Sequence, residues 1–214
     1  NERLIGGAGD DRLDGGGGGD GADDGGADAG ITADLAAGTA SGEGEDVLVD
    51  IERIEGSEHD DVLRGRDAND ALIGHGGDDV LEGRGGGDWL RGGAGDDVLR
   101  GGDGWDMLTG DAGDDRLDGG AGDDTVRYDW AAGPVEVDLA AGTATGEGED
   151  VLVDVERVHG SRHDDAIAGD DGDNRPDGLG GDDVLDGRGG ADLLDGGQGA
   201  ALPRGGDGVD TAAD

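Results

Sequence analysis

Aspartates that recur every nine residues, with glycines at fixed offsets, are the residues of this chain best suited to chemistry. Residues 92–124 read GGAGDDVLR, GGDGWDMLT, GDAGDDRLD and GGAGDD. Glycine fills the first and fourth places and usually the second, aspartate the sixth, and an aliphatic residue the eighth. Carboxylate and main-chain oxygens suit a hard cation, and calcium accepts about six to eight of them flexibly. Magnesium requires a tighter geometry and sheds water reluctantly, so the pattern favours calcium.

The glycine-dense part of the unit must be a turn, because glycine reaches backbone angles that are costly for other residues and weakens a strand. The last three places, as in Val98, Leu99 and Arg100, suit a short strand whose leucine points inward. Two units then form one coil of turn, strand, turn and strand. We expect the aliphatic residues to stack between two parallel sheets and the sixth-place aspartates to follow both edges.

The unit resembles the nonapeptide of the RTX (repeats-in-toxin) calcium-binding β-roll family, whose repeats bind calcium. The resemblance implies an all-β fold, a right-handed parallel β-roll with two units per coil and with wider strand-containing inserts. It also implies that each ion lies between successive turns on one edge, bridged by sixth-place aspartates and held by main-chain oxygens of the first four places.

Carried over to matching positions, the resemblance predicts a set of calcium ligands. The predicted carboxylates are Asp11, Asp20, Asp61, Asp70, Asp79, Asp88, Asp97, Asp106, Asp115, Asp124, Asp165, Asp183, Asp192 and Asp210. The predicted main-chain oxygens belong to Gly74, Gly77, Gly83, Gly86, Gly92, Gly93, Gly95, Gly101, Gly102, Gly104, Gly110, Gly113, Gly119, Gly120 and Gly122. Stacking the units in coils gives about ten ions in total, of which about six lie in the longest run.

The units divide the chain into five parts. These are residues 1–23 with two units, an insert at 24–55, eight units at 56–127, a second insert at 128–159, and six partly degenerate units at 160–214. A longer period of 104 residues relates the two inserts and their flanks, so the chain is a tandem array. In each insert, period-two alternation predicts two strands, at 134–139 and 151–155 in the second copy, with a loop at 142–148 between them. We expect the inserts to continue the roll as wider coils.

Several positions depart from the pattern. Asn174 and Ala201 replace the sixth-place aspartate, and Pro176 and Pro203 stand at the inward place of the same two units. Proline cannot donate to a sheet ladder, so we expect the last third to be less ordered and to bind less calcium. Fifth-place acids such as Asp96 alternate outward and are interpreted as surface charge.

Composition excludes several classes of protein. The 214 residues include 54 glycines, no phenylalanine and no cysteine, which rules out an ordinary globular core and a disulfide framework. Fifteen arginines and no lysine face 56 acids, for a net charge of −41, so no basic patch for nucleic acid exists. No apolar run approaches the roughly 20 residues of a membrane span. The mutual repulsion of the acids indicates that order requires cations.

No catalytic constellation is apparent, so we expect the segment itself not to be an enzyme. The pair His159 and His163 lacks the glutamate of a metalloprotease helix, and the three serines lie in no nucleophile motif. The resemblance instead implies a calcium-binding segment of a secreted bacterial RTX protein that folds on binding calcium outside the cell. Export through a type I machinery would use regions beyond this segment. The alternative is a calcium-dependent module that binds an extracellular polysaccharide or a cell surface, with exposed tryptophans such as Trp89 contributing.

Overall fold

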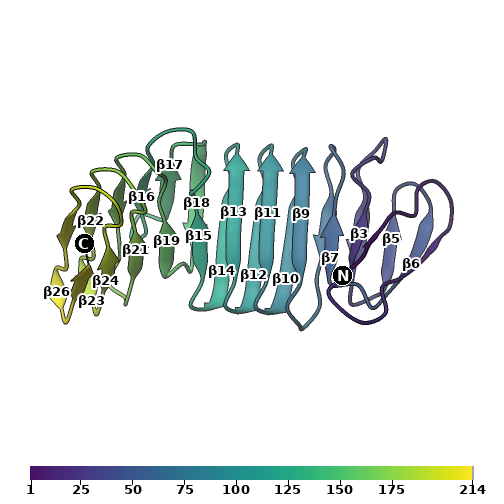
Figure 1. The fold of residues 1–214 in the computed structure, drawn as a ribbon, viewed down its shortest axis with the longest axis horizontal. Coiled ribbons are helices and arrows are strands. Elements are labelled where there is room, and N and C mark those ends of the chain that lie inside the picture. The colour runs from purple at the N-terminus through teal and green to yellow at the C-terminus, as the bar shows by residue number, and fades with distance from the viewer. Residues whose placement is uncertain (214) are drawn as a thin grey trace.

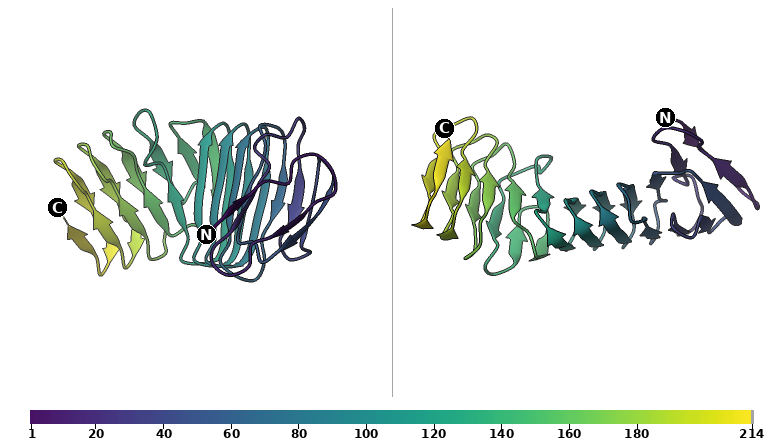
Figure 2. Two further views of the ribbon diagram at one scale, coloured as in Figure 1. Left: turned by 45° about the vertical axis from the view of Figure 1, so that its right-hand side comes forward. Right: turned by 90° about the horizontal axis from the view of Figure 1, so that it is seen from below.

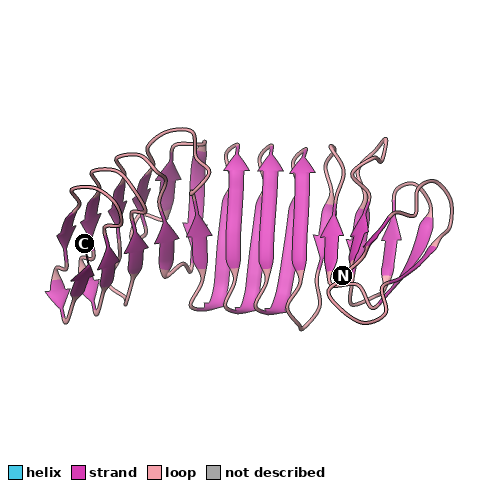
Figure 3. Ribbon diagram, viewed as in Figure 1, coloured by secondary structure: helices cyan, strands magenta, loops and turns pink. Residues whose placement is uncertain are grey.

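The computed structural model describes residues 1–213 and folds them into a β-solenoid that contains no helix in that range (Figures 1 and 3). No segment of the described chain therefore forms a helix able to cross a membrane. Two long sheets face each other along the solenoid axis, and we name them sheet A and sheet B. The predicted all-β parallel roll is confirmed.

Sheet A has 11 strands, all parallel to their neighbours. In spatial order they are β1 (Arg3–Leu4), β3 (Gly21–Asp23), β7 (Arg53–Glu55), β9 (Ala71–Gly76), β11 (Trp89–Ala94), β13 (Met107–Ala112), β15 (Thr125–Arg127), β19 (Arg157–His159), β21 (Arg175–Asp177), β24 (Leu193–Asp195) and β27 (Thr211–Ala213).

Sheet B has 14 strands, and a separate pair is formed by β23 (Gly189–Gly190) and β26 (Asp207–Gly208). In spatial order sheet B contains β2 (Arg12–Asp14), β6 (Glu45–Val49), β5 (Thr39–Ser41), β4 (Thr32–Asp34), β8 (Val62–Arg64), β10 (Val80–Gly86), β12 (Val98–Gly104), β14 (Arg116–Gly122), β18 (Glu149–Val153), β17 (Thr143–Thr145), β16 (Glu136–Asp138), β20 (Ala166–Ala168), β22 (Val184–Asp186) and β25 (Leu202–Arg204).

The central run, from β8 to β15, is the most regular part of the solenoid (Figure 1). Its eighth-place residues pair in register with the residue 18 positions on, as Leu81 does with Leu99. These side chains are completely shielded from solvent, as the pattern predicted: Leu63, Leu72, Leu81, Leu90, Leu99, Leu108, Leu117 and Val126. The hydrophobic core is thus a ladder of single aliphatic residues between two sheets.

Each insert adds three strands to sheet B and one to sheet A. In the second copy β16 pairs with β17 and β17 with β18, both antiparallel, while β16 and β18 join the parallel strands on either side. The first copy repeats this arrangement with β4, β5 and β6. The prediction of a loop at 142–148 is wrong in part, because β17 lies within this range. The inserts pair into both sheets and do not form a separate layer.

The solenoid is bowed, and both ends curve to the same side of the central run (Figure 2, right). The bends fall where the inserts join the sheets. An insert adds three strands to sheet B but only one to sheet A, so sheet B becomes locally longer than sheet A along the solenoid axis. A straight axis cannot accommodate this difference, and the solenoid bends.

The last third continues both sheets with shorter strands. Strands β20 to β25 have two or three residues, whereas β9 to β14 have six or seven. Pro176 is buried in β21, and the pairing of β21 with β24 is reduced to Asp177 and Asp195. The missing proline N–H accounts for this local loss of pairing.

Candidate calcium sites

The sixth-place aspartates form a buried column on each edge of the central run. The first edge, where the chain passes from sheet A to sheet B, carries Asp61, Asp79, Asp97 and Asp115. The second edge, where it passes from sheet B to sheet A, carries Asp70, Asp88, Asp106 and Asp124. All eight residues are at most 5% exposed.

A ladder of hydrogen bonds fixes one oxygen of these carboxylates. From Asp61 to Asp106, the main-chain N–H of each sixth-place residue donates to Oδ1 of the sixth-place aspartate 18 residues on, in the following turn of the same edge. The distance is 2.8 Å from Asp79 N to Asp97 Oδ1 and 2.7 Å from Asp88 N to Asp106 Oδ1. Each such bond therefore orients a carboxylate toward the preceding coil.

The second oxygen of most of these carboxylates has no hydrogen-bond partner. The unpaired buried Oδ2 atoms at sixth places belong to Asp20, Asp79, Asp88, Asp97, Asp106, Asp115, Asp124, Asp183 and Asp192. A buried acceptor without a donor is costly, and a buried charge without a counter-ion costs more. These atoms are suited to a bound cation.

Burial changes the acidity of the sixth-place carboxyls. It raises the pKa of Asp79, Asp88, Asp97 and Asp115 from 3.8 to about 7, and that of Asp124 to about 6. The main-chain N–H of the neighbouring turn opposes the rise of each pKa, and the negative charges of nearby acids add to it. Without bound cations, the buried environment disfavours the charged carboxylate form of these groups.

The glycines leave space for the carboxylates and carbonyls to approach one another. A Cβ added to Gly92 would overlap Asp97 Oδ2, and one added to Gly95 would overlap the carbonyl oxygen of Gly77 in the preceding coil. Gly93 and Gly95 also have φ of 130° and 133°, which L side chains rarely adopt. The predicted main-chain oxygens that face the first-, second- or fourth-place glycine of a neighbouring coil belong to Gly74, Gly77, Gly83, Gly86, Gly92, Gly95, Gly101, Gly102, Gly104 and Gly119. The ligand role of all the predicted main-chain oxygens remains a prediction.

Three of the predicted carboxylates have both oxygens paired by the protein itself. These are Asp61, Asp70 and Asp165, whose main donors are Ser57, Arg66 and Ser161, respectively. The other two, Asp11 and Asp210, are half-buried in terminal turns. The sixth-place residues look equivalent in the sequence, but in the structure some have an unpaired carboxylate oxygen and others have both oxygens paired.

Four acids outside the nine-residue register occupy equivalent rungs of the ladder. Asp46 and Asp150 accept from the N–H of Asp11 and Asp115 at 2.8 Å and 3.1 Å. Glu52 and Glu156 accept from the N–H of Asp20 and Asp124 at 3.0 Å and 2.9 Å. The sequence analysis missed all four, because they follow the preceding rung by 35 or 32 residues, not by 18. Their recurrence at 104 residues was the available signal.

The fifth-place acids are exposed, as expected, and also form an outer ladder. Asp78 Oδ1 accepts from Asp96 N, and Asp96 Oδ1 accepts from Asp114 N, each at 2.9 Å. In this outer ladder each N–H donates to a carboxylate of the preceding turn, whereas in the sixth-place ladder it donates to a carboxylate of the following turn. Its carboxylates remain exposed to solvent, unlike those of the buried column.

The donor set on each edge combines carboxylates of successive turns with main-chain oxygens. Among residues 1–213, no three histidine, cysteine or acidic side chains converge on one point as in a site built from side chains alone. A site made from two carboxylates and several carbonyls needs no such cluster, and oxygen-only donors of this kind fit calcium. The unpaired Oδ2 atoms are the observation that supports this fit.

A solenoid whose glycine turns enclose stacked columns of buried aspartates defines a repeat protein suited to bind cations. The family model described as the RTX calcium-binding nonapeptide repeat (4 copies) matches residues 1–29, 55–90, 82–117, 100–130 and 169–201. The chain therefore belongs to the RTX calcium-binding repeat family. A search of curated proteins found no match to the chain.

Proposed function

We propose that this segment is a calcium-dependent β-roll whose folding and calcium binding form one equilibrium. The supporting observation is the row of nine buried carboxylate oxygens that lack any donor. A bound ion between successive turns would neutralise two facing carboxylates and complete their coordination. When bound, calcium supplies electrostatic neutralisation and an oxygen-coordinating link between coils.

The segment's own residues orient the carboxylates at these proposed calcium positions. The ladder N–H groups orient Oδ1, which directs Oδ2 of residues such as Asp97 toward the first-place glycine of the same unit. The leucine ladder fixes the spacing of the coils. About ten divalent ions, each adding two positive charges, would bring the net charge from −41 to about −21. Repulsion among the remaining carboxylates is then much weaker, so order follows ion binding.

Secretion fits the same physical account. A chain with this composition stays disordered where calcium is scarce, which suits passage through a type I exporter. Millimolar calcium outside the cell fills weak sites that remain empty in a cytosol at roughly micromolar calcium or below. We therefore propose that the segment belongs to a secreted bacterial protein and has a binding role, not a catalytic one.

The proposal is tested by two adjacent substitutions in the full segment. Asp97→Asn removes a buried charge from the first-edge column, whereas Asp96→Asn removes an exposed charge and keeps an amide oxygen as acceptor. We expect Asp97→Asn to lower the number of bound calcium ions by at least one in equilibrium dialysis, and Asp96→Asn to leave it unchanged. Equal effects of the two substitutions would contradict ligation by the sixth-place column.

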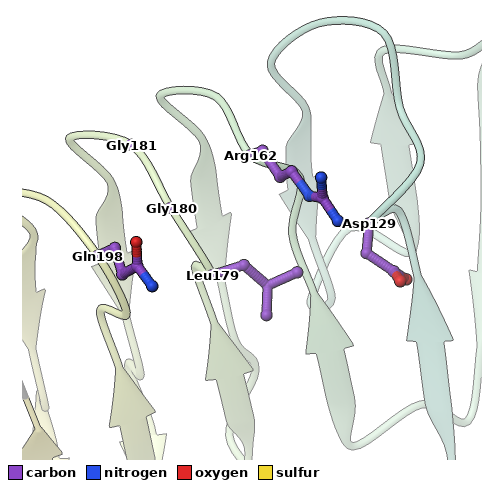
Figure 4. A pocket seen from close by; sticks show the side chains of 6 residues that line it. All are labelled: Asp129, Arg162, Leu179, Gly180, Gly181 and Gln198. Carbon is purple, nitrogen blue, oxygen red and sulfur yellow. The ribbon is translucent and has the colours of Figure 1, made fainter.

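A second candidate function is binding of a polysaccharide that carries carboxylates. A cavity of about 650 Å³ in the second half of the chain is lined by Asp129, Arg162, Leu179, Gly180, Gly181 and Gln198 (Figure 4). Arg162 makes no ion pair within residues 1–213, although acids outnumber arginines several-fold, and its guanidinium lies 5.9 Å from the ring centre of exposed Trp130. A free arginine beside an aromatic face suits an acidic sugar.

This candidate has its own test. Calcium-loaded protein is titrated with a uronic-acid oligosaccharide, and Arg162→Ala is compared with Arg204→Ala, which removes the same charge outside the cavity. We expect at least tenfold weaker binding only for Arg162→Ala. No binding by the unmodified protein, or equal losses in the two variants, would eliminate the candidate.

A further inference from the structure

Three sixth-place carboxylates are saturated by donors from the chain itself. Both oxygens of Asp61, Asp70 and Asp165 accept hydrogen bonds, and none of the three has the unpaired Oδ2 of the central column. We call residues 56–61, 65–70 and 160–165, which end in these aspartates, the self-paired turns. Each one lies within two units after an insert.

Serine closes two of the self-paired turns. Ser57 donates its N–H to Asp61 Oδ2 at 2.6 Å and its hydroxyl to Oδ1 at 3.0 Å, and Ile31 N–H donates to Oδ1 at 2.7 Å. Ser161, Asp165 and Val135 repeat the same three bonds at 2.5, 2.7 and 2.8 Å. Both serines are completely buried. Three donors leave these carboxylates little capacity for an ion.

Arginine closes the third self-paired turn. The Arg66 guanidinium donates to Asp70 Oδ1 at 2.7 Å through one terminal nitrogen, and its other terminal nitrogen donates to Glu52 Oε1 at 3.4 Å. Its main-chain N–H donates to Asp70 Oδ2 at 2.6 Å. Glu52 and Asp70 are successive rungs of the second edge, so the Arg66 cation bridges the kind of gap that we propose calcium to occupy elsewhere in the central run.

The backbone of this turn also departs from that of the glycine turns in the central run. Neither Arg66 nor Ala68, at the second and fourth places, has a positive φ, whereas Gly93 and Gly95 at the same places do. The carbonyls of residues 65–68 therefore do not reproduce the arrangement found in the glycine turns.

The second copy lacks both the cation and its carboxylate. At the positions 104 residues on, Asp170 replaces Arg66 and Asn174 replaces Asp70, while Glu156 matches Glu52. Asn174 Oδ1 accepts the N–H of Asp170 at 2.7 Å, so this turn also satisfies its sixth place without an external ion. Arginine and aspartate are present together in one copy and absent together in the other, which is the pattern of a paired unit.

We propose that the self-paired turns bind no calcium and that Arg66 substitutes for the ion between Glu52 and Asp70. In the central run, calcium binding then begins only beyond these turns, at Asp79 on the first edge and Asp88 on the second. Counting gaps between free carboxylates reduces the ions of the central run from about six to about four. This inference rests on the proposed calcium binding and specifies which aspartates take part in it.

Two neighbouring rungs of the second edge give the test. In the full segment at saturating calcium, native mass spectrometry or equilibrium dialysis counts bound ions for Asp70→Asn and Asp88→Asn. We expect Asp70→Asn to retain the full count and Asp88→Asn to lose at least one ion. Loss of an ion from Asp70→Asn as well would overturn the inference. Absence of calcium binding by the unmodified segment would instead refute the proposed function.

A second variant tests the cation directly. Arg66→Gly frees Glu52 and Asp70 and supplies the second-place glycine of a regular turn, so we expect one additional ion. Arg188→Gly is the matched control, because that second-place arginine pairs with Asp138 and no sixth-place carboxylate. An unchanged ion count in folded Arg66→Gly, or an equal gain in Arg188→Gly, would count against Arg66 as the substitute cation.

Discussion

Protons compete with cations for the sixth-place carboxyls at the scale of single residues. In the unfolded chain these groups have a pKa near 3.8, whereas burial raises the pKa of Asp79 and Asp97 to about 7 in the roll. The protonated form is thus favoured by folding when calcium is absent. Its stabilising effect is complete below the unfolded pKa and is lost as pH rises through the folded pKa.

A pH titration in chelator tests this. We expect the strand content of the metal-free segment to increase as pH falls from about 8 to about 5, because protons replace ions in neutralising the column. Circular dichroism measures the change. A strand content that rises with increasing pH in chelator would contradict the raised pKa values.

At the scale of single residues, the sequence identified the chemistry but not all participants. The nine-residue spacing placed Asp79 and Asp97 in line along one edge, and the structure shows that this column is buried. It did not distinguish Asp70 from the other sixth-place aspartates, because the pairing of both Asp70 oxygens depends on the conformation of the Arg66 side chain. It missed Glu52 and Glu156, since a rung supplied by an insert follows the preceding rung by 32 residues and not by 18.

The leucine ladder carries the stability of the structural elements. Leu99 is completely buried between β10 and β14, whereas Val98 beside it is only half-buried. We expect Leu99→Ala to cost about 2–5 kcal/mol of folding free energy and Val98→Ala clearly less. Because folding and binding are coupled, the calcium concentration at the folding midpoint rises accordingly. A calcium titration followed by circular dichroism measures this, and equal midpoints for the two variants would refute the role of the ladder.

The elements were predictable where one period governs them. Every strand from β8 to β15 follows from an eighth-place aliphatic residue and a glycine turn. Strand β17 did not follow, because its short Thr-Ala-Thr segment between glycine-rich stretches looks like a loop. Antiparallel pairing with β16 and β18 makes it a strand, and this tertiary contact has no local signal.

The inserts shape the molecule as a whole. Deletion of residues 128–159 joins the unit ending at Arg127 to the unit beginning at Gly160 in phase, because strands of sheet A precede both junctions. We expect the calcium-loaded deletion variant to be straighter, because the local excess of strands in sheet B is removed. Small-angle X-ray scattering reports this as a loss of bend in the distance distribution. A variant that folds but keeps the original curvature would separate the bend from the insert.

For the molecule as a whole, we propose that calcium binding and folding form one equilibrium. The most direct measurement is far-ultraviolet circular dichroism of the segment during addition of calcium, with magnesium as the control. We expect a cooperative change from coil to sheet at roughly millimolar calcium and none with magnesium. A full sheet spectrum in chelator at neutral pH would contradict it, because the leucine ladder would then suffice without ions.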